Sequence, residues 1–346
     1  MSRVRATILT LAVLLAGLSA PAFAMDGVNQ TGGGGSSGSG SPGPGSGEGY
    51  ASIQATLLDV SRHFRETLLG RLHHVLGSGK DAWSEGFASW NRQDGTASAS
   101  RLNDSDIGTF VGFDTPIIAD WRLGVAGGYV ESRPNIAGAA TTVKANTYNA
   151  AIYTGGSFAG FDLNGGFAYS DHRIHMQRVA SSIDYLSAYS GQTVQAFAEA
   201  GYGFDVGPAV LEPTASVAWV NLDHSNFIEI GDPSAYSGRT SGMNLGYSEF
   251  GARVSASVDF LGVHFLPRGE LEWQHVLGGT VPSVSLESNG SDFTALGVPV
   301  ARDQAAVKLG IDVVFAPSFT AGLGYDAAFA AHAQSQTVGV TLSVMF

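Results

Sequence analysis

The sequence predicts an all-β membrane protein, a 12-stranded antiparallel transmembrane β-barrel with an N-terminal α-helix in the lumen. The last segment, residues 337–346, has apolar residues at even positions and Thr, Gly or Ser at odd positions up to Ser343. One face of such a strand suits lipid and the other suits a polar lumen. Similar alternating segments fill most of the chain before it, and a segment of helical periodicity precedes them. Gly accounts for 47 of 346 residues and only 14% are charged, which favours the same fold.

The N-terminus predicts export. Residues 1–24 begin with two arginines, continue with an apolar run and end in Ala22-Phe23-Ala24. This pattern is typical of a secretory signal peptide, so we expect the mature chain to begin near Met25. Residues 25–50 are rich in Gly and Ser and cannot form a core, so we expect a disordered linker or a vestigial passenger there.

Residues 51–77 predict a linker α-helix. Apolar side chains recur every three to four positions, at Ile53, Leu57, Val60, Phe64, Leu68 and Leu72. Such a helix is about 40 Å long, close to the depth of a membrane with its head groups. It can therefore run through a barrel, although an amphipathic helix lying on a surface is an alternative.

Residues 80–346 predict the barrel itself. Alternating segments are separated by Gly, Pro, Asn and Asp turns. The predicted strands cover residues 81–93, 107–117, 121–134, 142–158, 161–178, 191–207, 209–229, 242–261, 263–278, 301–316, 319–330 and 334–346. Short turns alternate with longer stretches at 179–190, 230–241 and 279–300, as expected for short periplasmic turns and long external loops.

Strand parity predicts which charged residues face the lumen. In residues 249–260, for example, apolar and polar positions alternate without a break. Extending this parity gives the predicted lumenal set Glu199, Asp205, Glu212, Glu249, Arg253, Asp259, Arg268, Glu270, Glu272, Lys308 and Asp312. Because most of these are acidic, we expect them to hold a basic helix by ion pairs. Helix–lumen contacts are predicted for Arg62, Arg65, Arg71, Glu199, Glu249, Arg253, Asp259, Glu270 and Glu272.

The composition excludes several other functions. Without cysteine there are no disulfides, thiolate metal sites or cysteine nucleophiles. The formal net charge of −12 argues against nucleic acid as a partner. His172 and His175 are three positions apart, so they fall on opposite faces of a strand and do not converge on a metal. The chain therefore predicts no metal-binding or cofactor-binding residue.

The best enzymatic alternative is a barrel-type outer-membrane hydrolase. Its base would be one of His172, His175, His224, His264, His275 and His332. His275 shares the outward face with Leu271 and Trp273, but its place at a strand end suits the interfacial girdle better. Since no Ser is singled out by the pattern, we predict no catalytic residue and no enzymatic activity.

Five stretches in this order resemble the translocator domain of monomeric autotransporters, the type V secretion proteins. They are residues 108–114, 121–129, 267–275, 297–310 and 324–326, followed by the terminal Phe346. The resemblance covers residues 51–346. It implies a helix-filled barrel in the outer membrane of a Gram-negative bacterium that carries an N-terminal passenger to the cell surface.

The resemblance also implies partners. These are outer-membrane lipid, periplasmic chaperones and the barrel-assembly machinery, which reads the last strand; a monomer is expected. The assembly signal carried over to this chain consists of Val338, Val340, Leu342, Val344 and Phe346.

Two departures from the family pattern matter. Only residues 25–50 lie between the signal peptide and the helix, too few for a folded passenger. Residues 51–77 contain no Asn, so we expect no self-cleavage at an Asn in the helix. A porin or channel-like barrel without cargo is therefore the main alternative, although a Gly/Ser linker and an amphipathic segment do not precede porins.

Overall fold

The computed structural model describes residues 47–73, 79–118 and 120–346. The predicted signal peptide, most of the predicted linker and residues 74–77 of the predicted helix lie outside these described residues. Within them, no helix is both long enough and apolar enough to cross a membrane.

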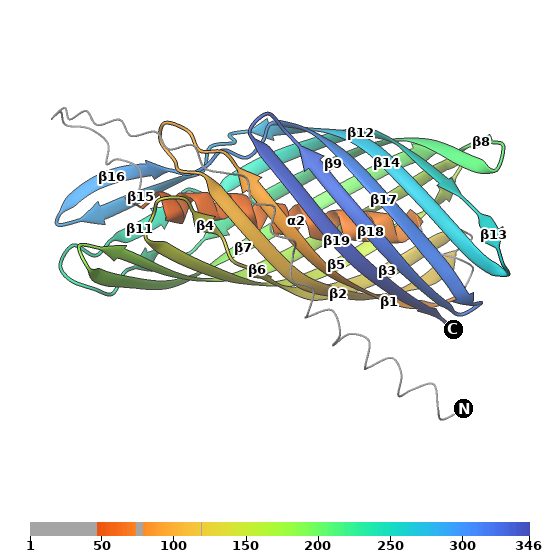
Figure 1. The fold of residues 1–346 in the computed structure, drawn as a ribbon, viewed down its shortest axis with the longest axis horizontal. Helices are drawn as coiled ribbons and strands as arrows, with labels where there is room; N and C mark the ends of the chain where they lie inside the picture. The colour runs from red at the N-terminus through yellow and green to blue at the C-terminus, as the bar shows by residue number, and fades with distance from the viewer. Residues whose placement is uncertain (1–46, 74–78, 119) are drawn as a thin grey trace, which may run out of the picture. The chain divides into compact units, whose positions relative to one another are not determined.

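The described residues confirm the predicted fold class, a closed antiparallel barrel of twelve strands around one helix (Figure 1). The strands in order around the barrel are β1 (Asp81–Gln93), β2 (Leu102–Ile118), β3 (Trp121–Ser132), β5 (Thr141–Phe158), β6 (Phe161–Ala180), β7 (Ile183–Tyr202), β9 (Ala209–His224), β12 (Met243–Ala256), β14 (Val263–Gly278), β17 (Asp303–Ala316), β18 (Phe319–Phe329) and β19 (Ala333–Met345). Each strand pairs with its neighbour in the sequence of barrel strands. Barrel strands that are consecutive along the chain are therefore also neighbours in the sheet.

The barrel closes between its first and last strands. β1 pairs with β19 along its whole length, from Asp81 opposite Met345 to Gln93 opposite Ala333. Beyond the strand ends, the backbone of Lys80 exchanges two hydrogen bonds with that of Phe346, at 3.1 and 2.9 Å. Closure removes the edges that an open sheet would expose.

The two ends of the barrel differ. At the short-turn end, successive strands are joined by turns near residues 120, 159–160, 207–208, 261–262 and 317–318. The turns at 207–208 and 261–262 sit at the tips of short extensions, β8 (Phe204–Val206) and β13 (Val258–Phe260). At the long-loop end, four connections have eight or more residues, at 94–101, 133–140, 225–242 and 279–302, whereas β6–β7 and β18–β19 are joined by two and three residues.

Two stretches predicted as loops, residues 179–190 and 279–300, consist largely of β-strands, so their predicted boundaries are wrong. β6 and β7 meet at Ser181 and Ser182, whose φ angles of 50° and 63° form the left-handed two-residue turn of a hairpin. Residues 183–190 therefore belong to β7. Gly and Asn are the usual residues in such a turn. Because serine occupies both positions here, the sequence carries no local signal for the turn.

A small second sheet covers part of the long-loop end. Its strands are ordered β10 (Phe227–Ile228), β11 (Ser237–Thr240), β15 (Ser283–Ser288) and β16 (Ser291–Leu296). We call this the cap sheet. It is made of residues predicted as loops or strand ends, and Figure 1 shows β11, β15 and β16 at the end of the barrel opposite the C-terminus. The two-residue β4 (Asn135–Ile136) extends the wall between β2 and β5.

The helix α2 (Glu48–His73) lies inside the barrel (Figure 1). It begins three residues before the predicted start, because the barrel and its loops enclose its first turn: residues 48–58 are all buried. Its apolar side chains meet the wall in one core cluster that includes Leu57, Phe64 and Leu68. The ring of Phe64 lies 4.8 Å from that of Phe110 on β2.

Glycines on β2 make room for aromatic rings of β1 in this core. A Cβ on Gly108 would lie 2.7 Å from the ring of Phe87, and one on Gly112 would lie 2.4 Å from that of Trp83. A side chain at either position would clash with the ring, so this packing needs glycine. On the outer face, by contrast, large apolar side chains such as Phe167 and Leu271 are exposed, as expected where lipid covers the wall.

Candidate functional site: the lumen around the helix

The middle of the helix is held by a buried arginine. Arg65 is 1% exposed, and its guanidinium donates to Glu249 of β12 at 2.9 Å and to Gln195 of β7 at 3.3 Å. It also lies 4.9 Å from the ring centroid of Tyr247. Gln195 in turn donates to the backbone carbonyl of Ser61, at 2.9 Å. One helix side chain is thus tied to two strands of the wall.

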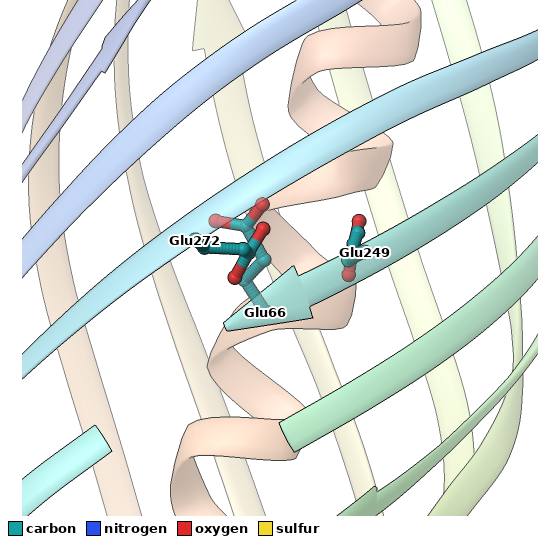
Figure 2. A group of neighbouring side chains, drawn as sticks. All are labelled: Glu66, Glu249 and Glu272. Atoms are coloured by element: carbon teal, nitrogen blue, oxygen red, sulfur yellow. The ribbon is translucent and has the colours of Figure 1, made fainter. Parts of the chain in front are cut away.

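The carboxylates of Glu66, Glu249 and Glu272 lie close together beside this contact (Figure 2). One oxygen of each lies within 4.8 Å of the others. Lys308 of β17 donates to Glu272 at 2.9 Å and lies 3.9 Å from Glu66. Arg62 donates to Glu66 from one turn earlier on the helix, at 2.9 Å.

Among the residues that the structure describes, these three carboxylates lie close enough together to hold a metal ion. Three side-chain cations, Arg62, Arg65 and Lys308, already contact them. The cluster therefore has little excess negative charge for a divalent cation, and its geometry is that of an internal ion-pair network.

The helix C-terminus is held by a second network at the short-turn end. Arg71 donates to Asp114 of β2 at 3.1 Å and also forms a short contact with Asp81 of β1. Asp114 is fully buried and accepts a further bond from Arg122 of β3 at 2.8 Å. Tyr153 donates to the same carboxylate at 3.3 Å. Two arginines and one tyrosine therefore converge on Asp114.

A third network joins the helix to the opposite wall. His73 contacts Glu199 of β7 at 2.6 Å. Arg253 of β12 lies 3.6 Å from Glu199, 3.1 Å from Glu212 and 3.3 Å from Glu270. Arg253 thus balances several wall carboxylates rather than contacting the helix directly.

The helix N-terminus is held in a different way, by the long loops. Tyr50 is fully buried and stacks on Phe227 of β10, with ring centroids 3.9 Å apart. Its hydroxyl donates to Glu229 at 2.9 Å and lies 2.7 Å from Ser187 Oγ. Arg178 donates twice to the Glu229 carboxylate, at 2.9 and 2.6 Å. This arrangement, which we call the tyrosine latch, fixes the first helical turn to the loops.

Other loop contacts complete this seal. The backbone amide of Ser100 donates to Glu48 at 2.9 Å, and that of Val298 donates to the Ser52 hydroxyl at 3.1 Å. A Cβ on Gly297 would lie 2.6 Å from the backbone of Ser52. At the surface of the same loops, the hydrogen bond from Tyr185 holds the pKa of the Asp232 carboxyl below its usual range.

A cavity of about 170 Å³ lies beside the helix toward the short-turn end. Helix residues His63, Thr67 and Arg71 line one side of it. Strand residues including Glu85, Arg268 and Asp312 line the other, together with Ser318 in a short turn. The helix therefore fills the lumen more completely at the long-loop end than at the short-turn end.

The comparisons with known proteins agree with this geometry. A family model described as the autotransporter β-domain matches residues 82–326. The chain belongs to the autotransporter β-domain family. The resemblance noted in the sequence is confirmed, and as a member of this family the chain is an outer-membrane translocator.

Solved autotransporter domains share the fold. The translocator domain of the autotransporter NalP from Neisseria meningitidis matches with a TM-score of 0.71 at 14% identity, covering 86% of this chain and 98% of that one. The transport unit of AIDA-I from Escherichia coli matches with a TM-score of 0.59 at 16% identity, covering 79% and 91%. The β-domain of Bordetella BrkA also matches with a TM-score of 0.59, at 13% identity, covering 78% and 100%.

Curated relatives extend well beyond this chain. Two proteins of Serratia marcescens, each described as an extracellular serine protease, are 28% identical over 312 and 315 residues. Each alignment covers 86% of this autotransporter chain and 30% of the relative. The chain therefore spans under a third of the length of the curated relatives it matches.

The structure places the predicted helix residues in two different settings. Arg65 and Arg71 contact wall carboxylates, whereas Arg62 pairs within the helix, with Glu66 and with Asp59 at 3.6 Å. Spacing explains the difference, because residues three and four apart are neighbours on a helix. Of the predicted wall residues, Glu249 and Glu199 contact the helix, Glu270 pairs with Arg253, and Glu272 reaches Glu66 through Lys308.

The placement of Asp259 in the lumen is wrong. Asp259 lies on β13 near the tip of a hairpin at the short-turn end, 82% exposed, and pairs with His264 at 2.9 Å. Asp205 on β8 is likewise exposed. Both follow the parity of their strands, but each hairpin continues past the barrel rim, where neither face is enclosed.

Sequence reasoning missed Asp81, Asp114, His73 and Tyr50. The parity that located Glu249 also applies to β1 and β2, where Asp81 and Asp114 lie opposite one another in register. The same parity therefore predicts a lumenal position for both carboxylates. Tyr50 had no such signal, because its partners Ser187, Phe227 and Glu229 lie in stretches that the sequence predicts as a loop or a strand end.

The last strand presents its predicted faces. The hydroxyls of Thr337 and Ser343 bond to Ser89 and Asp81 on the lumenal side of β1. The apolar even positions therefore point outward, and Phe346 at the end is 69% exposed. Its ring lies 6.1 Å from that of Phe113.

Proposed function

We propose that this autotransporter chain delivers the segment before Gly47 to the cell surface and anchors it there with α2 in the lumen. The observation that carries this proposal is the direction of the helix. Its first turn is buried among the long loops, and its last turn lies among the short-turn strands. Because external loops are long and periplasmic turns are short, the chain before Gly47 would leave the lumen on the outside.

The assembly route is part of the same proposal. Residues 1–24 would direct export through the inner membrane as a signal peptide. Periplasmic chaperones would then deliver the chain, and the barrel-assembly machinery would read Val338, Val340, Leu342, Val344 and Phe346 on the last strand. The outward direction of this apolar face supports that role, and the folded product would be a monomer in outer-membrane lipid.

The helix would stay in the barrel after export. Residues 51–77 contain no Asn, so the anchor has no such residue at which to cut itself. The protease activity named for the Serratia marcescens relatives belongs to proteins of which this chain spans 30%. We propose a transport and anchoring role for the barrel and no enzymatic role.

Cysteine labelling tests the proposed direction, since the chain has no native cysteine. A membrane-impermeant maleimide is applied to intact cells that produce Gly40→Cys. Asn289→Cys in the β15–β16 turn marks the long-loop end, and Ser318→Cys in the β17–β18 turn marks the short-turn end. We expect labelling at 40 and 289 on intact cells and at 318 only after permeabilisation. Labelling at 40 that needs permeabilisation would contradict the proposal.

A further inference from the structure

The outer face of β3, β5 and β6 changes character abruptly toward the long-loop end. Val125, Ile152 and Phe167 lie opposite one another in register and are all exposed and apolar. Two rows further on, Tyr129 lies opposite Tyr148, with ring centroids 5.4 Å apart. Aromatic side chains that border the apolar band of a membrane protein are typical of the interface between lipid tails and head groups.

The tyrosine row ends at a charged residue, because Tyr148 lies opposite Asp171 of β6, and charged or polar side chains fill the next row. Glu131, Asn146 and Arg173 lie opposite one another in register, directly beyond the tyrosines. One row further, Lys144 lies opposite His175. Alternate residues of a strand are about 6.6 Å apart, so these groups occupy the first two head-group layers above the aromatic belt.

Cationic groups exceed anionic groups in these rows. Arg133 and Lys144 share the one carboxylate of Glu131, at 2.6 and 2.7 Å. Arg173 lies 3.1 Å from Asp171. The side chains of Arg133 and Arg173 are nevertheless 70% and 66% exposed, so both remain accessible from outside the barrel. This local excess of positive charge contrasts with the whole chain, whose formal net charge is −12.

We propose that Arg133, Lys144 and Arg173 form an outer basic patch that binds the phosphate groups of an anionic lipid in the outer leaflet. Guanidinium groups match phosphate oxygens in a paired geometry, and cations beside a membrane are attracted to anionic head groups. The patch continues the lipid-facing surface of the barrel without a gap. A lipid head group therefore reaches it without any rearrangement of the protein. The inference rests on the proposed orientation, with the long-loop end outside, and is independent of what the barrel displays.

Binding of purified lipid A to the folded, detergent-solubilised full chain tests the patch. The variant Arg133→Gln/Arg173→Gln removes its two most exposed cations. A matched control, Lys80→Gln/Arg239→Gln, removes two exposed cations from the short-turn end and the cap sheet. Heat-modifiable electrophoretic mobility shows that each protein is folded. The ligands are bisphosphorylated lipid A, dephosphorylated lipid A and inorganic phosphate.

We expect the patch variant to bind bisphosphorylated lipid A roughly tenfold more weakly than the unaltered chain, and the control to bind as the unaltered chain does. Dephosphorylated lipid A should bind weakly to all three proteins, and inorganic phosphate should not compete at equal concentration. Equal binding by the patch variant and the unaltered chain would overturn the proposal, as would an equal loss in the control. Failure here would leave the surface-labelling result unchanged, so the two proposals fail separately.

Discussion

The two ends of α2 are held in the barrel by different physics. At the long-loop end, every residue from 48 to 58 is buried, and Tyr50 stacks on Phe227 of the cap sheet. At the short-turn end, Arg71 pairs with Asp81 and Asp114 beside the cavity. The first end is fixed by close packing and the second by buried charge. The end that points toward the proposed outside is thus the better sealed one.

The largest expected effect is at the short-turn end. Asp114→Ala would leave Arg71 and Arg122 buried without their shared carboxylate, which typically costs about 3–5 kcal/mol. Urea unfolding in lipid vesicles would measure this loss in the free energy of unfolding.

Asp94→Ala is the matched control, because Asp94 also contacts two arginines but is 42% exposed. We expect it to change the free energy of unfolding by less than about 1 kcal/mol. Similar losses in both variants would show that the Arg71 network does not hold the helix by buried charge.

The tyrosine latch should respond to ring removal more than to hydroxyl removal. Tyr50→Phe keeps the stack on Phe227 and loses the bond to Glu229, for an expected cost of about 1 kcal/mol. Tyr50→Ala also removes the ring, and large aromatic deletions cost about 3 kcal/mol or more. The same unfolding experiment measures both. If Tyr50→Phe proved as costly as Tyr50→Ala, the hydrogen bond and not the packing would dominate this end.

Hydrogen exchange compares the two ends within one molecule. Amides of residues 53–60 are enclosed by loops and wall, whereas residues 70–73 are only half-buried beside the cavity. We therefore expect slower exchange in the first segment, since local opening is easier where fewer contacts must break. Mass spectrometry of the folded chain in detergent would resolve the two segments. Faster exchange at residues 53–60 would reverse the comparison.

The smallest expected effect is in the loops around the latch. The bond from Tyr185 lowers the pKa of Asp232, so this contact stabilises the loop above the ordinary carboxyl pKa of about 3.9 and is lost as the pH falls below it. Limited proteolysis of residues 225–242 with an acid-stable protease should become faster through that range. In Asp232→Asn the cleavage rate should lack this pH-dependent step, and an unchanged step would exclude Asp232 as its source.

Local patterns predicted the wall well because each strand carries its own period of two. The ends of β14, β17 and β18 lie within two residues of the predicted positions. Arg65 and Glu249 could also be selected, since helical spacing and strand parity place them in the same lumen. Which partner each charge takes depends on barrel register and helix rotation, and neither is encoded in a local pattern.

The cap sheet and the tyrosine latch could not be predicted in this way. Phe227, Glu229 and Ser187 come together only after the barrel has brought distant loops to one end. The prediction that Asp259 faces the lumen was wrong for a related reason. Asp259 follows the parity of the lumen-facing residues on its strand. The sequence does not show, however, where a hairpin extends beyond the rim of the barrel.

The central claim is that α2 occupies the lumen and is held there by the wall. Single-channel conductance in planar bilayers tests it most directly, comparing the unaltered chain with a variant that lacks residues 48–73. Heat-modifiable mobility establishes that the shortened barrel is folded. The account predicts low conductance for the unaltered chain and a several-fold larger conductance without the helix, because the lumen of a twelve-stranded barrel is then open. Equal conductance in the two proteins would contradict the claim.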